Sequence, residues 1–135
     1  MRLPLLFLLF FVATARAATF KIDPHTFTVP DGFIVERVAG PPLVDRPIVA
    51  DFDEKGRLYV ADSSGSNDKT EKQLQDKPHR IVRLEDSDRD GRFDKTIVYA
   101  DKMMFPEGAM WFEGSLYVAA PPSIWKLTDT DNDGV

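Results

Sequence analysis

The sequence has no cysteine in its 135 residues, and its 17 lysines and arginines are outnumbered by 22 aspartates and glutamates. The missing cysteine excludes disulfide bonds and the C-x-x-C-H motif that attaches haem. The net charge of −5 argues against nucleic acids and anionic membrane surfaces as partners. Stability must therefore come from packing, and the acidic composition suits the binding of cations.

Long hydrophobic runs are also lacking beyond the N-terminus. There, Leu3 to Ala13 is apolar, but this run is too short to span a bilayer comfortably. One basic residue, Arg2, precedes it, and the small-x-small triplet Ala15-Arg16-Ala17 follows it. This order predicts a secretory signal peptide over residues 1–17 and export to the periplasm or the cell exterior, with no transmembrane span after cleavage. An uncleaved anchor or a buried strand is the alternative.

The chain contains an internal repeat. Gly56–Asp62 (GRLYVAD) matches Gly114–Ala120 (GSLYVAA), and Arg80–Asp86 matches Ser123–Asp129. The first pair of segments is 58 residues apart and the second pair 43, so the first copy holds an insertion within residues 63–79. Repeats of about 40–50 residues are typical of solenoids, propellers and arrays.

Each copy has the pattern of several short strands. Ile81–Leu84 alternates apolar and charged residues, and Thr96–Tyr99 is rich in β-branched and aromatic residues. Asp53–Gly56 has the residues of a tight turn. The expected strands are residues 48–52, 58–60, 81–84 and 96–99 in the first copy, and 109–112, 116–118 and 124–127 in the second. Four strands per repeat predict an all-β fold made of β-propeller blades.

This pattern divides the chain after the signal peptide. Residues 18–47 form a lead-in, in which Phe33–Val38 is expected to be an outer strand that closes the ring. Residues 48–107 form a first blade with an exposed loop at the insertion 63–79, and residues 108–135 begin a second blade. Because two blades cannot close a ring, we interpret the sequence as the N-terminal part of a longer propeller. A complete small β domain is the alternative.

Acidic residues recur at one position of the repeat. The run Asp86–Asp94 (DSDRDGRFD) is matched by Asp129–Val135 (DTDNDGV). Carboxylates at alternate positions before a glycine converge on one point, which suits the many oxygens that Ca²⁺ requires. An EF-hand is disfavoured because Ile97 stands where its bidentate glutamate belongs. The pattern instead resembles the calcium loops set in β-hairpins of integrin α-chain propellers.

The calcium hypothesis names a specific set of ligands. They are the side chains of Asp86, Asp88, Asp90 and Asp94, the backbone carbonyl of Arg92, and in the second copy Asp129, Asp131 and Asp133. An acidic, solvated turn without metal is the alternative, but like charges in one turn repel each other by roughly some tenths of a kcal/mol. In a propeller blade these loops lie on the rim opposite the insertion, so we expect them to be structural sites.

Several segments taken together resemble one protein family. They are GRLYVAD from Gly56, HRIVRLEDSDRDGRFD from His79, FPEGAMW from Phe105 and SLYVAAPPSIWKL from Ser115. Over about residues 28–135 the chain is similar to glucose/sorbosone dehydrogenase-like proteins. These are six-bladed, TolB-like propellers related to soluble PQQ-dependent sugar dehydrogenases. The likeness is greatest to their large exported members labelled "membrane-bound dehydrogenase", in which a cytochrome c module often follows.

The resemblance implies an oxidoreductase that uses PQQ to oxidise CH–OH groups of a sugar or another alcohol. Its partners would be this substrate and the remaining blades, and the present chain by itself would be inactive. No position clearly matches the family's catalytic histidine. His79 and Glu107 are the candidates on the expected rim, His25 is expected at the surface, and Trp111 and Trp125 are expected in the core. The alternative function is a non-catalytic, calcium-stabilised propeller used for binding or adhesion.

Overall fold

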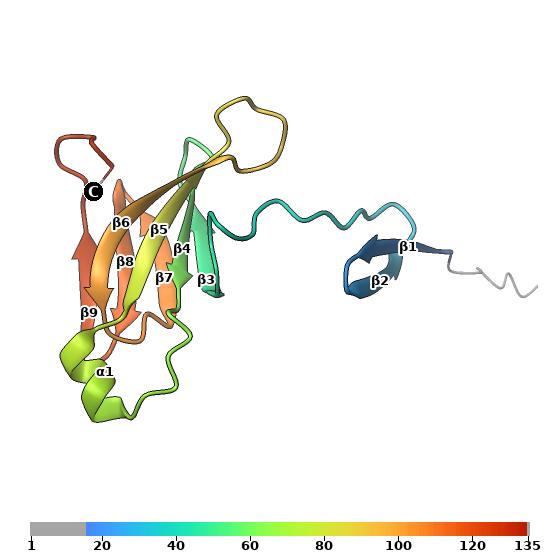
Figure 1. Ribbon diagram of the computed structural model, residues 1–135. Coiled ribbons are helices and arrows are strands. Elements are labelled where there is room, and N and C mark those ends of the chain that lie inside the picture. Colours follow the sequence, from blue (N-terminus) through green and yellow to red (C-terminus); the bar gives the residue numbers. More distant parts are fainter. Residues whose placement is uncertain (1–15, 135) are drawn as a thin grey trace, which may run out of the picture. The chain divides into compact units, whose positions relative to one another are not determined.

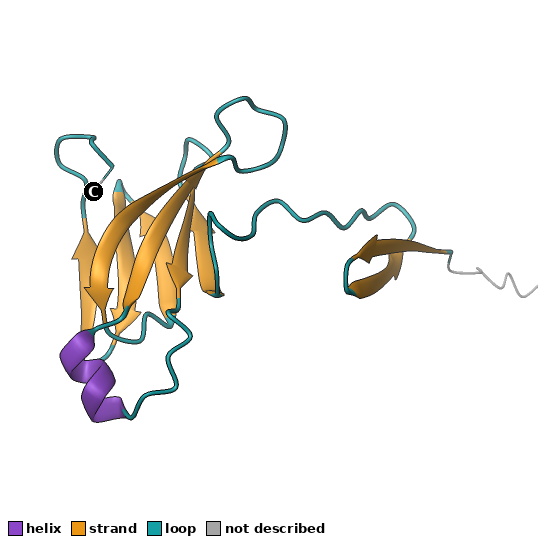
Figure 2. Cartoon of the chain, viewed as in Figure 1, coloured by secondary structure: helices purple, strands orange, loops and turns teal. Residues whose placement is uncertain are grey.

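The structure is a computed structural model that describes residues 16–134. It consists mostly of strands in three antiparallel sheets, with one short helix among the described residues (Figure 1, Figure 2). The predicted all-β class is therefore confirmed. The predicted signal peptide lies almost wholly outside the described residues. The chain divides into two compact units, and the boundary along the sequence lies between Arg37 and Val38.

The first unit holds a two-stranded hairpin that the sequence analysis did not predict. β1 (Ala17–Ile22) pairs antiparallel with β2 (His25–Pro30) through a two-residue turn. Threonines alternate with apolar residues along β2, which favours an extended backbone. The predicted ring-closing strand at Phe33–Val38 is wrong, since residues 33–40 have no regular secondary structure and no strand partner in the described chain. A β-prone segment forms a strand only where a neighbouring edge can pair with it.

The second unit begins with a four-stranded sheet whose strands are ordered as in the sequence. They are β3 (Pro47–Phe52), β4 (Leu58–Asp62), β5 (His79–Glu85) and β6 (Lys95–Met103). All four contain the strands predicted above. The predicted β3–β4 turn also forms, because buried Asp53 accepts hydrogen bonds from the N–H groups of Lys55 and Arg57, both at 2.9 Å. Gly56 supplies the positive φ of 78° that this turn requires.

A three-stranded sheet follows and confirms the other three predicted strands. It contains β7 (Gly108–Phe112), β8 (Ser115–Ala120) and β9 (Ser123–Leu127). The repeat is visible in the strand register. Leu58 pairs with Leu84 in the first sheet, and their counterparts Leu116 and Leu127 pair in the second.

The two sheets of this unit pack against each other around an aromatic centre. Tyr59 is fully buried there. Its ring stacks on Trp111 with 4.7 Å between centroids and meets Tyr99 edge-on at 4.9 Å. Burial raises the pKa of Tyr59 to about 12, so its hydroxyl group is neutral at physiological pH. Trp111 is half-buried and packs against the core, as expected.

Residues of the lead-in cover the opposite face of the β3–β6 sheet. Val44 packs there with Val60, Val82 and Leu84 in a second buried cluster. The Phe93 N–H also donates a hydrogen bond to the lead-in, at the carbonyl of Val38. The first sheet therefore has both faces covered within this unit.

The buried carboxylate of Asp62 anchors this part of the lead-in. Its Oδ1 accepts hydrogen bonds from the N–H groups of Asp45 at 3.1 Å and Arg46 at 2.7 Å. Its Oδ2 accepts from Arg80, at 2.9 Å from Nε and 2.7 Å from Nη2. One carboxylate thus joins the lead-in to β4 and β5.

The outer face of the β7–β9 sheet has no such cover in the described chain. Met110, Phe112 and Ile124 have exposed fractions of 54, 53 and 79 %. The strand register places all three on the same face as Tyr117, which is the repeat counterpart of Tyr59. Tyr117 is only half-buried, whereas Tyr59 is fully buried. The face that the first sheet buries against the second is therefore open in the second sheet.

The insertion between β4 and β5 is largely exposed, as expected, but it holds a helix that was not predicted. Residues Thr70–Asp76 form the helix α1, and both Gln73 and His79 are buried. Nδ1 of His79 accepts a hydrogen bond from the Ser64 N–H at 3.1 Å, so Nε2 carries the proton and donates it to Oε1 of Gln73 at 3.1 Å. Burial also lowers the pKa of His79, which favours the neutral ring. This buried pair fixes a helix too short to be stable alone.

No helix in residues 16–134 combines the length and the hydrophobicity needed to cross a membrane.

Candidate metal centre

Both acidic stretches form loops at one end of the sheets, opposite the end that carries α1 (Figure 1). The first loop joins β5 to β6, and the second follows β9. Each brings three carboxylates together, with oxygens within 4.8 Å of one another: Asp86, Asp88 and Asp90, and Asp129, Asp131 and Asp133. The expected separation of the acidic loops from the insertion is confirmed.

The two loops have the same backbone geometry. The N–H of the glycine donates to the first aspartate in both, at 2.9 Å to Asp86 and 3.0 Å to Asp129. The left-handed positions also match: Arg89 and Asn132, with φ of 61° and 62°, and Gly91 and Gly134, with φ of 91° and 100°. The repeat therefore extends from sequence to the local fold of the acidic loops.

In the first loop, Asp94 does not join the group of carboxylates. It accepts hydrogen bonds from the hydroxyl and the N–H of Ser87, and these bonds lower the pKa of Asp94. Asp94 thus closes the base of the loop instead of completing a cage. Arg92 donates its N–H to Asp90 at 2.8 Å. The carbonyl of Arg92 as a metal ligand stays a prediction.

The second loop has a buried carboxylate with an unpaired oxygen. The side chain of Asp129 is only 10 % exposed, and its Oδ2 lies 3.5 Å from Nη1 of Arg83, a buried residue of β5. Its Oδ1 is buried and has no hydrogen-bond partner in the described chain. Arg83 also pairs with Glu85 at 2.8 Å. The first sheet therefore reaches the second acidic loop through Arg83, and one oxygen of that loop lacks a partner.

This geometry fits a hard divalent cation better in the second loop than in the first. A buried oxygen without a hydrogen-bond donor costs free energy, and a cation among the three carboxylates would supply the missing partner. In the first loop, both oxygens of Asp86 already accept from the N–H groups of Asp90 and Gly91. By its unpaired oxygen the second loop is the stronger candidate for Ca²⁺, while the positive charge of Arg83 beside Asp129 opposes a cation there.

The first loop should bind Ca²⁺ more tightly when Arg89 is replaced by asparagine. Arg89 occupies the left-handed region, which asparagine tolerates better, and it places a positive charge within the acidic loop. Since Asn132 fills the same place in the second loop, Arg89→Asn copies a sequence that the fold already accepts. We expect affinity at this loop to rise by roughly fivefold, about 1 kcal/mol, measured by calorimetric titration of Ca²⁺. Weaker binding by the variant would contradict this.

The two candidates for catalysis share one small cavity at the opposite end. His79 and Glu107 line a pocket of about 130 Å³ together with Phe105, whose ring centroid lies 5.4 Å from that of His79. This volume is below the roughly 300 Å³ of ordinary ligand pockets. Both ring nitrogens of His79 already bond within the protein. The arrangement makes His79 an anchor of the insertion and leaves no free nitrogen to accept a proton from a substrate.

The solvent exposure of the two remaining residues agrees with expectation at His25 and differs from it at Trp125. His25 is exposed, as expected. Trp125 is 48 % exposed, so its expected place in the core is wrong. Its repeat counterpart, Val82, is 1 % exposed because the lead-in covers it. The sequence does give a signal of this difference, because a small valine in the first copy is replaced by a large tryptophan in the second. Such a change in size indicates that the two positions are not packed alike.

Comparison with known proteins places the chain in a family. No curated protein and no solved structure gives a significant match to it. Residues 22–135 match a family described as a domain of unknown function (DUF7133), and this match includes both sheets of the second unit and both acidic groups. The chain therefore belongs to the family of domains of unknown function DUF7133.

Proposed function

We propose that this chain is part of an exported β-propeller in which Ca²⁺, bound by the acidic loops, stabilises the contacts between neighbouring sheets. The unpaired buried oxygen of Asp129 is the observation that carries the proposal, because it lies in an acidic group and a cation bound there would supply a partner for it. A metal there would act on more than its own loop, since Asp129 also contacts Arg83 of the preceding sheet.

The propeller part of the proposal is supported by how the two sheets stack. The first sheet contacts the second through its Tyr59 face, whereas the second sheet leaves the matching face, around Tyr117, open. The two sheets therefore use different faces for their contact. Such head-to-tail stacking can continue from repeat to repeat, and it gives a closed ring where the rotation between repeats allows it. Lys126, the counterpart of Arg83, is exposed beside the Tyr117 ring at 5.8 Å. In the first sheet, the residue at this position, Arg83, contacts the acidic loop of the second sheet. Lys126 could contact the acidic loop of a further sheet in the same way.

Calcium titration tests the metal part of the proposal. We expect Ca²⁺ to raise the free energy of unfolding, by about 2.7 kcal/mol at a hundred times the dissociation constant, and chelation to reverse the gain. Asp131→Asn removes a charge from the group at an exposed site, so it should weaken calcium binding by about tenfold while the metal-free stability stays nearly unchanged. The measurement is thermal unfolding together with calorimetric titration.

The matched control for this titration is Asp45→Asn, an exposed aspartate outside both acidic groups, which should leave calcium binding unchanged. Mg²⁺ at the same concentration controls for ionic strength, since this ion needs a near-ideal octahedral site. If Ca²⁺ stabilises the wild type and the Asp131→Asn variant equally, or no more than Mg²⁺ does, the loops are solvated turns and the metal proposal is wrong.

Quinone-dependent oxidation of a sugar or alcohol is the second candidate, and it rests on the resemblance to glucose/sorbosone dehydrogenase-like proteins. The observation in its favour is that His79 and Glu107 share one cavity. The calcium-stabilised, non-catalytic function has more support, because both nitrogens of His79 are engaged within the protein. Sugar-dependent dye reduction by the protein with added PQQ and Ca²⁺ would support the oxidoreductase function.

A further inference from the structure

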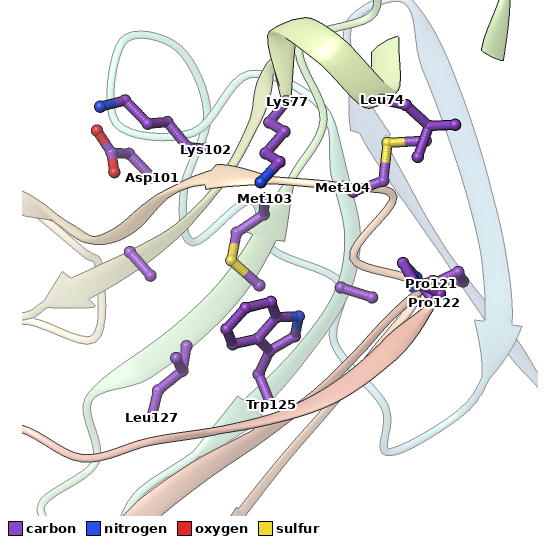
Figure 3. Close-up of a pocket in the computed structure, with 12 residues that line it drawn as sticks. Leu74, Lys77, Asp101, Lys102, Met103, Met104, Pro121, Pro122, Trp125 and Leu127 are labelled. Carbon is purple, nitrogen blue, oxygen red and sulfur yellow. The ribbon is translucent and has the colours of Figure 1, made fainter. Parts of the chain in front are cut away.

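A mostly apolar pocket of about 320 Å³ lies beside β6 and β9 (Figure 3). Met103 and Met104 line it and are buried, whereas Leu74 and Trp125 line it with exposed fractions of 46 and 48 %. Its volume is near the lower end of ordinary small-molecule pockets, about 300–1,000 Å³. Two large apolar side chains are thus left half-exposed around a concave surface.

One wall of the pocket comes from the segment that breaks the repeat. Leu74 belongs to α1, and this insertion has no counterpart in the second copy. The helix is held in place from its buried side, where Gln73 bonds to His79 and also donates to the carbonyl of Asp68 at 2.7 Å. The insertion therefore adds a fixed wall to the pocket. This wall is not part of the packing that the two copies of the repeat share.

Lys77 brings a positive charge to this apolar pocket. It ends α1 in the left-handed conformation with φ of 46°, where glycine is the usual residue. Figure 3 shows Lys77 extending toward Met103 and Trp125. Among residues 16–134, its ammonium group has no carboxylate within ion-pair distance.

We propose that this pocket binds a small planar aromatic anion, with its ring between Trp125 and the methionines and its carboxylate at Lys77. Methionine sulfur packs favourably against aromatic rings. Lys77 is exposed at the mouth of the pocket, and an ammonium group makes a charge-assisted hydrogen bond to a carboxylate. The site uses no residue of the acidic loops, so it stands apart from the calcium proposal.

Binding of 2-naphthoate to the full chain, followed by calorimetry, tests this site. We expect saturable binding that is about tenfold tighter than binding of the neutral analogue 2-naphthalenemethanol. Lys77→Gly should remove that difference. Because glycine suits the left-handed position, the variant should fold at least as well as the wild type, so a loss of binding cannot be attributed to unfolding.

A second lysine offers a matched control. Lys102 also lines the pocket and has a positive φ of 52°, but Figure 3 shows it extending away from Trp125, beside Asp101. Lys102→Gly should therefore leave 2-naphthoate binding within about twofold of wild type.

The indole is tested by Trp125→Val, which copies the first repeat, where Val82 fills this place. This change should weaken both the anion and the neutral analogue. The proposal is overturned if 2-naphthoate does not bind, if the neutral analogue binds as tightly, or if Lys102→Gly weakens binding as much as Lys77→Gly does.

Discussion

Replacing Tyr59 by alanine is expected to lower the free energy of unfolding by about 3–5 kcal/mol, whereas the same change at Tyr117 should cost only about 1 kcal/mol. The two tyrosines occupy the same place in the repeat. Tyr59 is fully buried between the sheets, where it contacts Trp111 and Tyr99, and its removal leaves a large cavity. Tyr117 lies on the open face of the second sheet, so less apolar area is lost.

Urea unfolding followed by circular dichroism, repeated over a range of protein concentrations, measures both changes. A loss at Tyr117 as large as that at Tyr59 would contradict the prediction and would mean that something covers the outer face of the second sheet. Concentration-dependent stability would identify that cover as a second copy of the chain. In a longer protein with a further sheet in place, we expect Tyr117→Ala to become as costly as Tyr59→Ala.

Replacing Asp62 by alanine is the second large expected loss, about 2–4 kcal/mol. The carboxylate is buried, and it accepts hydrogen bonds from two backbone N–H groups of the lead-in and from Arg80. The strand itself tolerates alanine here, since the repeat counterpart is Ala120, which is also buried. The loss would therefore report the anchoring of the lead-in and not the packing of the sheet.

Hydrogen exchange separates these two contributions to the effect at Asp62. The amides of Asp45 and Arg46 should lose protection in Asp62→Ala, while amides in the β7–β9 sheet keep theirs relative to the global stability. The double variant Asp62→Ala with Arg80→Ser copies the second repeat and should recover part of the loss, because no arginine is left without its partner. Unchanged exchange at residues 45 and 46 would show that the carboxylate does not hold the lead-in.

Most of the second unit could be predicted from the sequence because its strands are local patterns. The apolar residues of β5, the β-branched residues of β6 and the Asp53–Gly56 turn each favour a conformation through neighbouring residues alone. The hairpin β1–β2 was missed although its threonines carry a similar signal. Phe33–Val38 was predicted as a strand on propensity, yet pairing depends on a partner, which a sequence pattern does not show.

The acidic loops were predictable in position and only partly in geometry. Alternating aspartates before a glycine bring three carboxylates together in both loops. The sequence did not reveal that Asp94 turns to Ser87, because the choice between a metal and a nearby hydroxyl depends on distances across the loop. It also did not reveal the unpaired oxygen of Asp129, since burial of that side chain comes from Arg83 on another sheet.

The sequence by itself determined the all-β class, the repeat, the strands of both sheets and the two acidic turns, since all of these follow from short-range patterns. Only the tertiary structure decided which of two equivalent tyrosines is buried, that the insertion is a helix anchored by His79, and that Trp125 lines an apolar pocket beside Lys77. Repeated sequences specify repeated local conformations. Burial depends on which neighbour covers each face, and that neighbour differs from one copy to the next.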